Sequence, residues 1–435
     1  MDALDEIQES VVVKNGNSNT HSSLFSDLRP LGPEGPFSLE TQFIADSDSC
    51  KVNLIIGAYR NNQGQAWQPP SLVEAKKRIH VESCLHEYLP LHGSAEFLES
   101  SKLLVLGPEI TNQAYDRIAS IQTISGTGAN SLIAKFLDNH THPANIWLPD
   151  PTWVNHADIW KENAPGVDLR WYPYYDESSR SLSFSAMIQT LQRDTQENDA
   201  ILLHACAHNP TGLDPTKEQW EEIALVCKEK KLFVIFDSAY QGFASGDLDH
   251  DAWAIRHFFT HPGLEFAICQ SFSKNMSLYG ERLGALHIVV SRKSSSPPTA
   301  SVHGHLAEIQ RACVSMAPLF GSRVANEIFK SEDLHLMWQA DLLLMSNRIK
   351  TMRKAVYDEL VRLQTPGNWD HVVHQTGMFS YTGLTEEQVG RLRKEHHVYM
   401  LPSGRASICG LTCANFKYTA QAIHSVITDT QKRQV

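Results

Sequence analysis

An apolar, strand-like segment leads into a lysine and an arginine in Phe266-Ala267-Ile268-Cys269-Gln270-Ser271-Phe272-Ser273-Lys274-Asn275-Met276-Ser277-Leu278-Tyr279-Gly280-Glu281-Arg282. A lysine just past a buried strand carries a large desolvation cost unless it is paired. One resolution is a lysine held covalently as a Schiff base, with Arg282 as a fixed cation for a phosphate. The alternative is that Lys274 is a solvated loop residue. If no other motif supported a cofactor, this alternative would be the favoured interpretation.

Three further segments shift the balance toward pyridoxal 5′-phosphate (PLP), which needs both a lysine and a phosphate anchor. The first is Asp237, at the end of the apolar run Leu232–Phe236, which predicts a buried parallel strand. The carboxyl end of such a strand is where open α/β sheets bind ligands. A carboxylate there would pair with a protonated pyridine nitrogen, and Tyr240 would reach the ring's phenolate oxygen. The alternative role for Asp237 is a helix cap.

The second segment is the strand-to-turn run Ile201–Gly212, in which Asn209-Pro210-Thr211-Gly212 predicts a tight turn. Asn209 would then hold the same ring oxygen as Tyr240. His204 and His208 have a spacing of four, but in an extended strand they would lie roughly 13 Å apart, which disfavours a zinc site.

The third segment, Gln122–Asn130, contains Ser125, Gly126 and Thr127 and opens a predicted helix over Ala129–Leu137. Backbone N–H groups at a helix start bind phosphate. An ordinary strand-to-helix turn remains the alternative. The segment fits neither the dinucleotide glycine pattern nor the nucleotide phosphate loop, which disfavours a nicotinamide dehydrogenase.

From about Ser23 to the C-terminus the chain resembles the fold-type I PLP enzymes, specifically the aspartate aminotransferase family. The motifs occur in order: Gly57-Ala58-Tyr59-Arg60, Glu87-Tyr88-Leu89-Pro90, the Ser125 loop, Pro151-Thr152-Trp153, His204–Gly212, Asp237–Gly246, Ser271–Arg282 and Gly404-Arg405. The implied fold is α/β: a large PLP domain with a mostly parallel sheet over residues 66–345, and a smaller α/β domain from 23–65 and 346–435.

The resemblance implies a role for each matching residue. Lys274 would bind PLP and shuttle the substrate proton, with Asp237 on the pyridine nitrogen. The other cofactor contacts would come from Tyr240 and Asn209 at the ring oxygen, Trp153 on the ring face, and Ser125, Gly126, Thr127, Ser271 and Arg282 at the phosphate. Arg405 would grip the substrate α-carboxylate as a bidentate fork, helped by Gly57, Asn209 and Trp153.

Two further residues carry expectations about assembly and substrate. Tyr88 would reach the phosphate of a neighbouring subunit, which implies a homodimer with shared active sites. Arg311 matches the family's arginine for a side-chain carboxylate, although Ala312–Pro318 departs from the usual sequence after it. The alternative for Arg311 is a helix-surface residue.

Four other positions depart from the family pattern, and we expect all of them near the site: Ile55, His92, Val154 and Ser277. They leave two enzymatic hypotheses. The first is transamination between L-aspartate and 2-oxoglutarate. The second is the same cofactor acting on an aromatic or specialised amino acid, with elimination or decarboxylation as possible outcomes. A non-enzymatic scaffold is disfavoured because each predicted cofactor position keeps a suitable residue.

Composition sets the remaining expectations. The chain has 435 residues, 42% apolar and 20% charged, with a net charge of −11 that argues against nucleic-acid binding. No apolar run approaches the ~20 residues of a membrane helix. Eight scattered cysteines, mostly in apolar runs, predict buried free thiols and no zinc site. Residues 1–22 are polar and acid-containing, which predicts a disordered extension rather than a targeting signal, and hence a cytoplasmic protein.

Overall fold

The computed structural model describes residues 23–29, 35–79, 86–291 and 298–434. The predicted disordered extension, residues 1–22, lies outside these ranges. The run Ser294-Ser295-Ser296-Pro297-Pro298 predicts a loop, and its first four residues also lie outside them. No helix among the described residues is long and apolar enough to cross a membrane.

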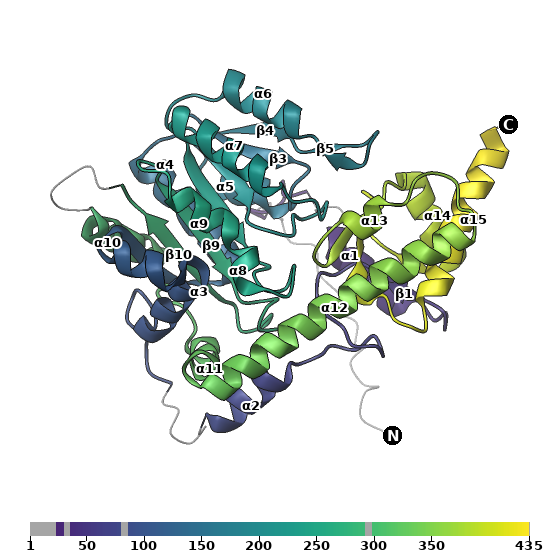
Figure 1. The fold of residues 1–435 in the computed structure, drawn as a ribbon, viewed down its shortest axis with the longest axis horizontal. Helices are drawn as coiled ribbons and strands as arrows, with labels where there is room; N and C mark the ends of the chain where they lie inside the picture. The colour runs from purple at the N-terminus through teal and green to yellow at the C-terminus, as the bar shows by residue number, and fades with distance from the viewer. Residues whose placement is uncertain (1–22, 30–34, 80–85, 292–297, 435) are drawn as a thin grey trace, which may run out of the picture.

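A seven-stranded sheet forms the centre of the fold (Figure 1). Its strands, in spatial order, are β2 (Ile118–Ile124), β10 (Leu283–Val289), β9 (Phe266–Ser271), β8 (Phe233–Ser238), β7 (Ala200–His204), β3 (Asn145–Asp150) and β4 (Asp168–Pro173). β10 is antiparallel to both of its neighbours, and the pairs from β9 to β4 are parallel. The prediction of an α/β fold with a mostly parallel sheet is confirmed.

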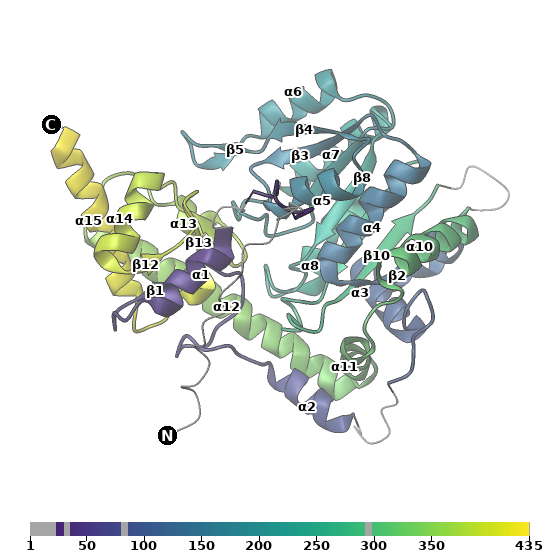
Figure 2. The same cartoon turned by 180° about the vertical axis from the view of Figure 1, so that it is seen from behind.

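Helices cover both faces of this sheet, because the strands are apolar on both sides. One face packs against α3 (Ala95–Gln113), α6 (Phe184–Asp194), α7 (Lys217–Glu229) and α9 (Trp253–Phe259). The other packs against α4 (Ser125–His140), α5 (Asn155–Asn163) and α10 (Thr299–Val314), which are seen in front of the sheet in Figure 2. Short elements complete this part: η2 (Tyr115–Arg117), β5 (Tyr175–Asp176), β6 (Ser181–Leu182) and α8 (Leu248–Asp251).

A second group of elements joins both ends of the described chain. It contains α1 (Gly35–Ala45), β1 (Val52–Asn53), α13 (His371–His374), β11 (Phe379–Tyr381), α14 (Glu386–His396), β12 (Val398–Tyr399), β13 (Arg405–Ser407), η3 (Ile408–Gly410) and α15 (Phe416–Gln434). β1 pairs with β12, and β11 with β13, so segments far apart in sequence meet. The predicted domain boundaries near residues 66 and 345 stay a prediction.

One long helix, α12 (Glu332–Arg362), runs from the sheet to the second group (Figure 1). At one end it contacts α2 (Pro70–Arg78) and α11 (Leu319–Lys330), and at the other α13 and α15. Arg353, in the second half of α12, is buried and donates hydrogen bonds to the carbonyl oxygens of Val372, Thr376, Gly377 and Phe379. This arginine fixes the loop that leads into β11.

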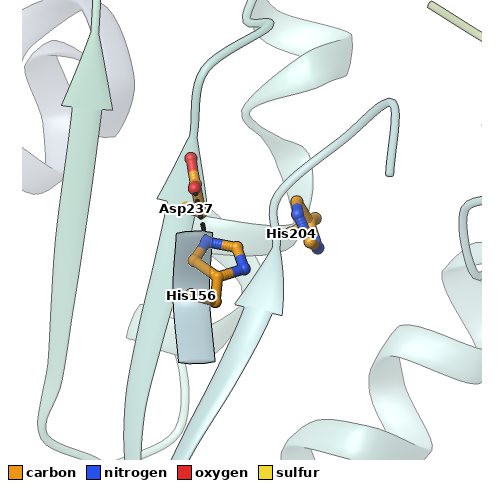
Figure 3. Close-up of side chains that lie close together, drawn as sticks. All are labelled: His156, His204 and Asp237. Atoms are coloured by element: carbon orange, nitrogen blue, oxygen red, sulfur yellow. Dashed lines mark hydrogen bonds and ion pairs between the residues drawn. The ribbon is translucent and has the colours of Figure 1, made fainter. Parts of the chain in front are cut away.

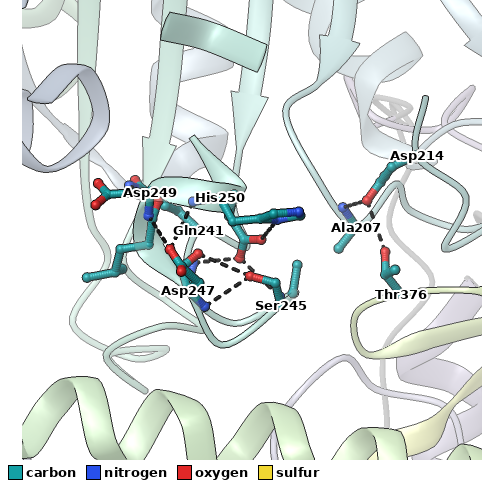
Figure 4. A network of polar contacts seen from close by, with 12 residues as sticks. Ala207, Asp214, Gln241, Ser245, Asp247, Asp249, His250 and Thr376 are labelled. Atoms are coloured by element: carbon teal, nitrogen blue, oxygen red, sulfur yellow. Dashed lines mark hydrogen bonds and ion pairs between the residues drawn. The ribbon is translucent and has the colours of Figure 1, made fainter. Parts of the chain in front are cut away.

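Three local predictions need correction. Asp214-Pro215 predicts a helix start, with Asp214 as the cap and Pro215 as the first helical residue. The helix there is α7, which begins at Lys217 behind a capping box of Thr216 and Gln219. Asp214 instead accepts hydrogen bonds from the Ala207 and His208 N–H groups and from Thr376 Oγ1 (Figure 4). It therefore ties the turn after β7 to the loop before β11.

The helix predicted over Ala129–Leu137 begins earlier, at Ser125, because small residues without strong helix propensity still start a helix where tertiary contacts hold it. The cysteines are also less uniformly buried than predicted. Four are buried (Cys206, Cys227, Cys269 and Cys409), three are exposed (Cys50, Cys313 and Cys413), and Cys84 lies outside the described residues.

Candidate active site

A cavity of about 860 Å³ opens at the carboxyl ends of the parallel strands. Most of the residues predicted to bind the cofactor or the substrate carboxylate line it: Gly57, Ser125, Gly126, Thr127, Trp153, Asn209, Asp237, Tyr240, Ser271, Lys274, Arg282 and Arg405. The volume lies in the range of ligand sites in proteins. The sheet thus brings together side chains from distant parts of the sequence.

Asp237 lies in the second-last position of β8 and is buried. Its Oδ2 accepts a hydrogen bond from His156 Nε2 at 2.9 Å, while its Oδ1 has no partner among the described residues. Burial acts to raise the pKa of Asp237, but the His156 hydrogen bond and the neighbouring His204 and Lys274 outweigh it, so the pKa is lowered. A buried anion with one free oxygen can accept a bond from a cationic N–H.

His156 was not singled out from the sequence, although it lies three residues after Trp153. Its Nδ1 faces Thr152 Oγ1 at 2.9 Å, and its ring is edge-on to Trp153. With the hydroxyl donating to Nδ1, Nε2 carries the proton toward Asp237. His156 therefore orients the Asp237 carboxylate by holding its Oδ2 oxygen.

His204 joins this pair, so that ligand atoms of His156, His204 and Asp237 lie within 4.8 Å of one another (Figure 3). The His156–Asp237 hydrogen bond occupies two of those atoms, which argues against a metal ion there. His204 and His208 are much closer than the predicted extended spacing, with ring centroids 4.2 Å apart, because the chain turns immediately after β7. Burial lowers the pKa of His204 to about 3.

Lys274 follows β9 and is half-buried, with its Nζ 5.2 Å from the centre of the Tyr240 ring. Burial lowers the pKa of Lys274, Asp237 opposes the shift, and Arg282 and Arg405 add to it. Burial raises the pKa of the Tyr240 phenol, with Asp237 adding to the shift. Near neutral pH the phenol therefore keeps its proton and can donate it in a hydrogen bond.

The first turn of α4 faces Ser271 at the end of β9 and Ser273 just after it. Ser125 Oγ lies 3.0 Å from Ser271 Oγ and 2.9 Å from Ser273 Oγ. A Cβ at Gly126 would come within 3.1 Å of the Ser271 Cβ, so a side chain here would crowd Ser271. Glycine avoids this contact and leaves the backbone N–H groups accessible. The Arg282 carbonyl oxygen accepts a hydrogen bond from the Ser125 N–H group. Arg282 therefore lies beside Ser125 in the cavity lining. Free helix N–H groups, hydroxyls and a guanidinium form an anion cradle.

Arg405 begins β13 and is 7% exposed. Its guanidinium lies 4.3 Å from the Phe379 ring and donates from Nη2 to the Ile55 carbonyl at 2.8 Å. Its Nε has no partner among the described residues, and burial lowers its pKa to about 10, so it stays charged at neutral pH. A buried cation with a free donor is a site for a carboxylate.

These features fit a bound PLP. The buried Asp237 Oδ1, Asn209 Oδ1 and Arg405 Nε lack partners among the described residues, and burying such atoms is costly unless a ligand satisfies them. The anion cradle at α4 suits the phosphate. Several lining residues were not predicted, among them Tyr279 and Phe379, and their positions depend on contacts that only the fold creates.

Two predicted residues lie away from this cavity. Tyr88 is 81% exposed, and Arg311 is exposed near the end of α10. Of the four departures from the family pattern, Val154 alone lines the cavity. His92 contacts the His303 carbonyl at 3.2 Å, and the Ile55 side chain is buried beneath α1 while its carbonyl accepts a hydrogen bond from Arg405. That all four positions lie near the site stays a prediction.

Comparison with known proteins identifies relatives along most of the chain. The sequence model described as "Aminotransferase class I and II" matches residues 49–423. An L-tyrosine:2-oxoglutarate aminotransferase from Aspergillus ustus is 43% identical, over 89% of this chain and 75% of that protein. The cytoplasmic aspartate aminotransferase of Schizosaccharomyces pombe is 41% identical, over 93% and 98%. The solved structure of the Saccharomyces cerevisiae cytoplasmic aspartate aminotransferase superposes with a TM-score of 0.90 at 39% identity, covering 93% and 99%.

Proposed function

Because this chain belongs to the class I and II aminotransferases, we propose that it transfers an amino group between L-aspartate and 2-oxoglutarate. The family's enzymes use PLP, and the cavity residues fit that cofactor. The relatives carry the choice of L-aspartate. The observation that carries the assignment to amino acids and 2-oxo acids is Arg405: a buried, charged guanidinium with a free donor, in the same cavity as Lys274. It would hold the α-carboxylate that amino acids and 2-oxo acids share.

PLP, when bound, supplies an electron sink for the charge left at the substrate Cα. The ionised Asp237 would hold the ring nitrogen protonated. Lys274 would hold the cofactor and, once released by the substrate amine, accept the Cα proton at Nζ. Its lowered pKa favours the neutral amine that this step needs. Tyr240 and Asn209 would bind the ring oxygen, and the substrates would react in turn with ping-pong kinetics.

We further propose a homodimer in which Tyr88 and Arg311 complete the partner's cavity. Both side chains are exposed and absent from the cavity of their own chain, which supports this arrangement. Arg311 would then bind the side-chain carboxylate of a dicarboxylic substrate. The names of the relatives from the two yeasts support a cytoplasmic location.

The test is Arg311→Ala in the PLP-loaded enzyme, with kcat/KM measured for L-aspartate and for L-alanine. Loss of a charge pair with the substrate should lower the value for L-aspartate roughly 100-fold and the value for L-alanine much less. The exposed Arg193→Ala serves as the matched control. Equal losses for both substrates would remove Arg311 from the proposal.

A second candidate is the same cofactor chemistry on an aromatic or specialised amino acid. The relative from Aspergillus ustus carries L-tyrosine in its name, and Val154 alters the cavity lining. Elimination would release ammonia and decarboxylation would release carbon dioxide, whereas transamination releases neither. Measuring both products for each amino acid therefore separates these reactions.

A further inference from the structure

Two histidines meet at the end of α9, on the face of the sheet that α7 also covers. His257 lies in the last turn of α9, and His261 follows four residues later, in the turn beyond the helix. This spacing places two side chains on the same side of a helical turn. Both side chains are partly exposed, and their Nε2 atoms lie 3.1 Å apart. The two imidazoles therefore present their nitrogens together at the surface.

The separation of these nitrogens matches that of two metal ligands. Histidine nitrogens bind Zn²⁺ at about 2.0–2.1 Å, so two of them 3.1 Å apart would subtend an angle of about 100° at the ion. This angle lies between the roughly 90° of octahedral and the roughly 109° of tetrahedral coordination. The ring centroids are 4.9 Å apart, farther than the nitrogens, so both Nε2 atoms lie on the facing edges of their rings.

Neighbouring contacts hold both histidines in place. Trp253 stacks on the His257 imidazole with the ring planes 7° apart, and it packs against the core of the sheet. The backbone of His261 is fixed by the turn, because its N–H group donates to the Phe258 carbonyl and its carbonyl accepts from the Leu264 N–H group. Little conformational freedom is therefore lost when an ion binds between them.

The surroundings of His261 favour the neutral imidazole, which is the form that binds metal ions. Burial lowers the pKa of His261, and His257 and Lys228 add to this shift, while Glu221 opposes it. Glu221 and Lys228 both belong to α7, which packs beside α9 (Figure 1). The Glu221 carboxylate supplies a negative charge near a bound cation, and Lys228 acts against that cation.

The proposed reaction does not use this pair. Neither histidine lines the active-site cavity, and α9 covers the face of the sheet opposite to α4, whose first turn forms the anion cradle. The pair also differs from the buried group of His156, His204 and Asp237, in which a hydrogen bond already occupies two ligand atoms. In the pair at the end of α9, both nitrogens border solvent-accessible side chains.

We propose that His257 and His261 bind a divalent transition-metal ion of the zinc, nickel and copper class through their Nε2 atoms, with water in the remaining coordination positions. Imidazole suits these ions, whereas Mg²⁺ and Ca²⁺ prefer oxygen ligands. The ion would join the end of α9 to the turn that leads to β9. Binding would stabilise the folded chain, because the unfolded chain does not hold the two nitrogens together.

The first experiment is a calorimetric titration of the PLP-loaded enzyme, prepared without a histidine tag, with Zn²⁺ and with Ni²⁺. His257→Gln and His261→Gln should each weaken binding at least about tenfold, because each removes one of two ligands. His374→Gln, at an exposed histidine of α13, should leave the affinity unchanged. Equal affinity in the wild type and both pair variants would show that the two imidazoles share only a hydrogen bond, and would overturn the site.

Electron paramagnetic resonance with one equivalent of Cu²⁺ identifies the ligands directly. Two imidazole nitrogens should split the copper signal of the wild type, and each variant of the pair should show one nitrogen fewer. A spectrum that neither variant changes would place the ion elsewhere and overturn the assignment.

Urea unfolding measures the consequence for stability. Saturating Zn²⁺ should raise the urea midpoint of the wild type and of His374→Gln, but not that of His261→Gln. An equal rise in His261→Gln would contradict the site. Turnover should be the same in all three proteins, because the pair lies outside the cavity. Metal binding is measured without substrate, so failure of the proposed function and failure of this inference are distinguished.

Discussion

At the sheet end of the cavity, Asp237 is 6% exposed and bonded to His156, which is bonded in turn to Thr152. By contrast, Val154, which lines the same cavity, is 61% exposed and belongs to no hydrophobic cluster of the described core. The sheet end is held by hydrogen bonds between buried groups from several strands and helices. Phe37, Ile56 and Val154 form an apolar part of the lining and come from three separate segments of the chain.

This difference separates two tasks. Groups that act on the reacting atoms must be held rigidly in place before the substrate arrives, since reorganising them during the reaction would cost rate. Side chains that select a substrate need only present surface of the right polarity. A substitution at the sheet end should therefore change the rate of the reaction more than one in the apolar part of the lining.

Lys274→Ala should have the largest effect and so tests the sheet end most directly. Loss of the proton acceptor alone should lower turnover roughly 10²–10⁴-fold, and loss of the covalent anchor should lower it further. Stability should be kept, because burial of the ammonium disfavours its charged form. Turnover and urea unfolding are measured beside Lys354→Ala, an exposed lysine of α12. A variant that kept most of its turnover would refute the role of Lys274.

Gly57→Ala should have an intermediate effect, at the boundary between the two regions. A Cβ there would lie 2.5 Å from Phe379 Cζ and 3.0 Å from Met378 Sδ, so the Phe379 ring would have to move away from Arg405. We expect KM to rise about tenfold and the free energy of unfolding to fall by about 1–3 kcal/mol. Gly390→Ala, where a Cβ would meet open space, is the control. Unchanged KM with lower stability would show that the ring does not support Arg405.

Asp46→Asn should have the smallest effect, at the end of α1 remote from Phe37. Asp46 accepts hydrogen bonds from Asp48 N, His397 Nδ1 and Tyr399 OH, which lower its pKa to about 2. A carboxylate with a depressed folded-state pKa stabilises the protein above its unfolded pKa of about 3.9, and this contribution is lost as pH falls toward 2.

The companion His397 has a raised pKa because of its hydrogen bond to Asp46. Its contribution is complete below its ordinary pKa of about 6.5 and declines as pH rises through the higher folded value. Wild type should therefore exceed Asp46→Asn most in urea-unfolding free energy between about pH 4 and 6.5. Parallel stability curves from pH 7 to pH 3 would contradict this account.

The sequence predicted central strands of the sheet because Leu232–Phe236 and Phe266–Cys269 are continuous apolar runs, which are typical of strands buried on both faces. The Leu232–Phe236 run became β8, with parallel neighbours on both sides, and the polar residues after the strands line one cavity. The predicted cofactor contacts themselves remain proposals. Their convergence follows from parallel strands having their carboxyl ends at one edge.

Predictions failed where the outcome depended on what a residue meets in space. Asp214 precedes a helix and so resembles a helix cap. Its carboxylate instead accepts hydrogen bonds from two N–H groups of its own turn and from Thr376. His92 follows the predicted motif Glu87–Pro90 closely in sequence, yet its ring lies beside the His303 ring and does not line the cavity. His156 was missed because nothing in its local sequence indicates the Asp237 carboxylate that it contacts from α5.

The length of α12 has a mechanical consequence. A helix of 31 residues is a rod of roughly 46 Å, so a tilt of about 5° at one end displaces the other by roughly 4 Å. Near the sheet, Asp341 of α12 accepts a hydrogen bond from the Ser71 N–H group. In the other half of the helix, Arg353 donates hydrogen bonds to the loop before β11. Small rotations of this rod would therefore carry Phe379 toward or away from the sheet while the hydrogen bonds around Asp237 stay unbroken.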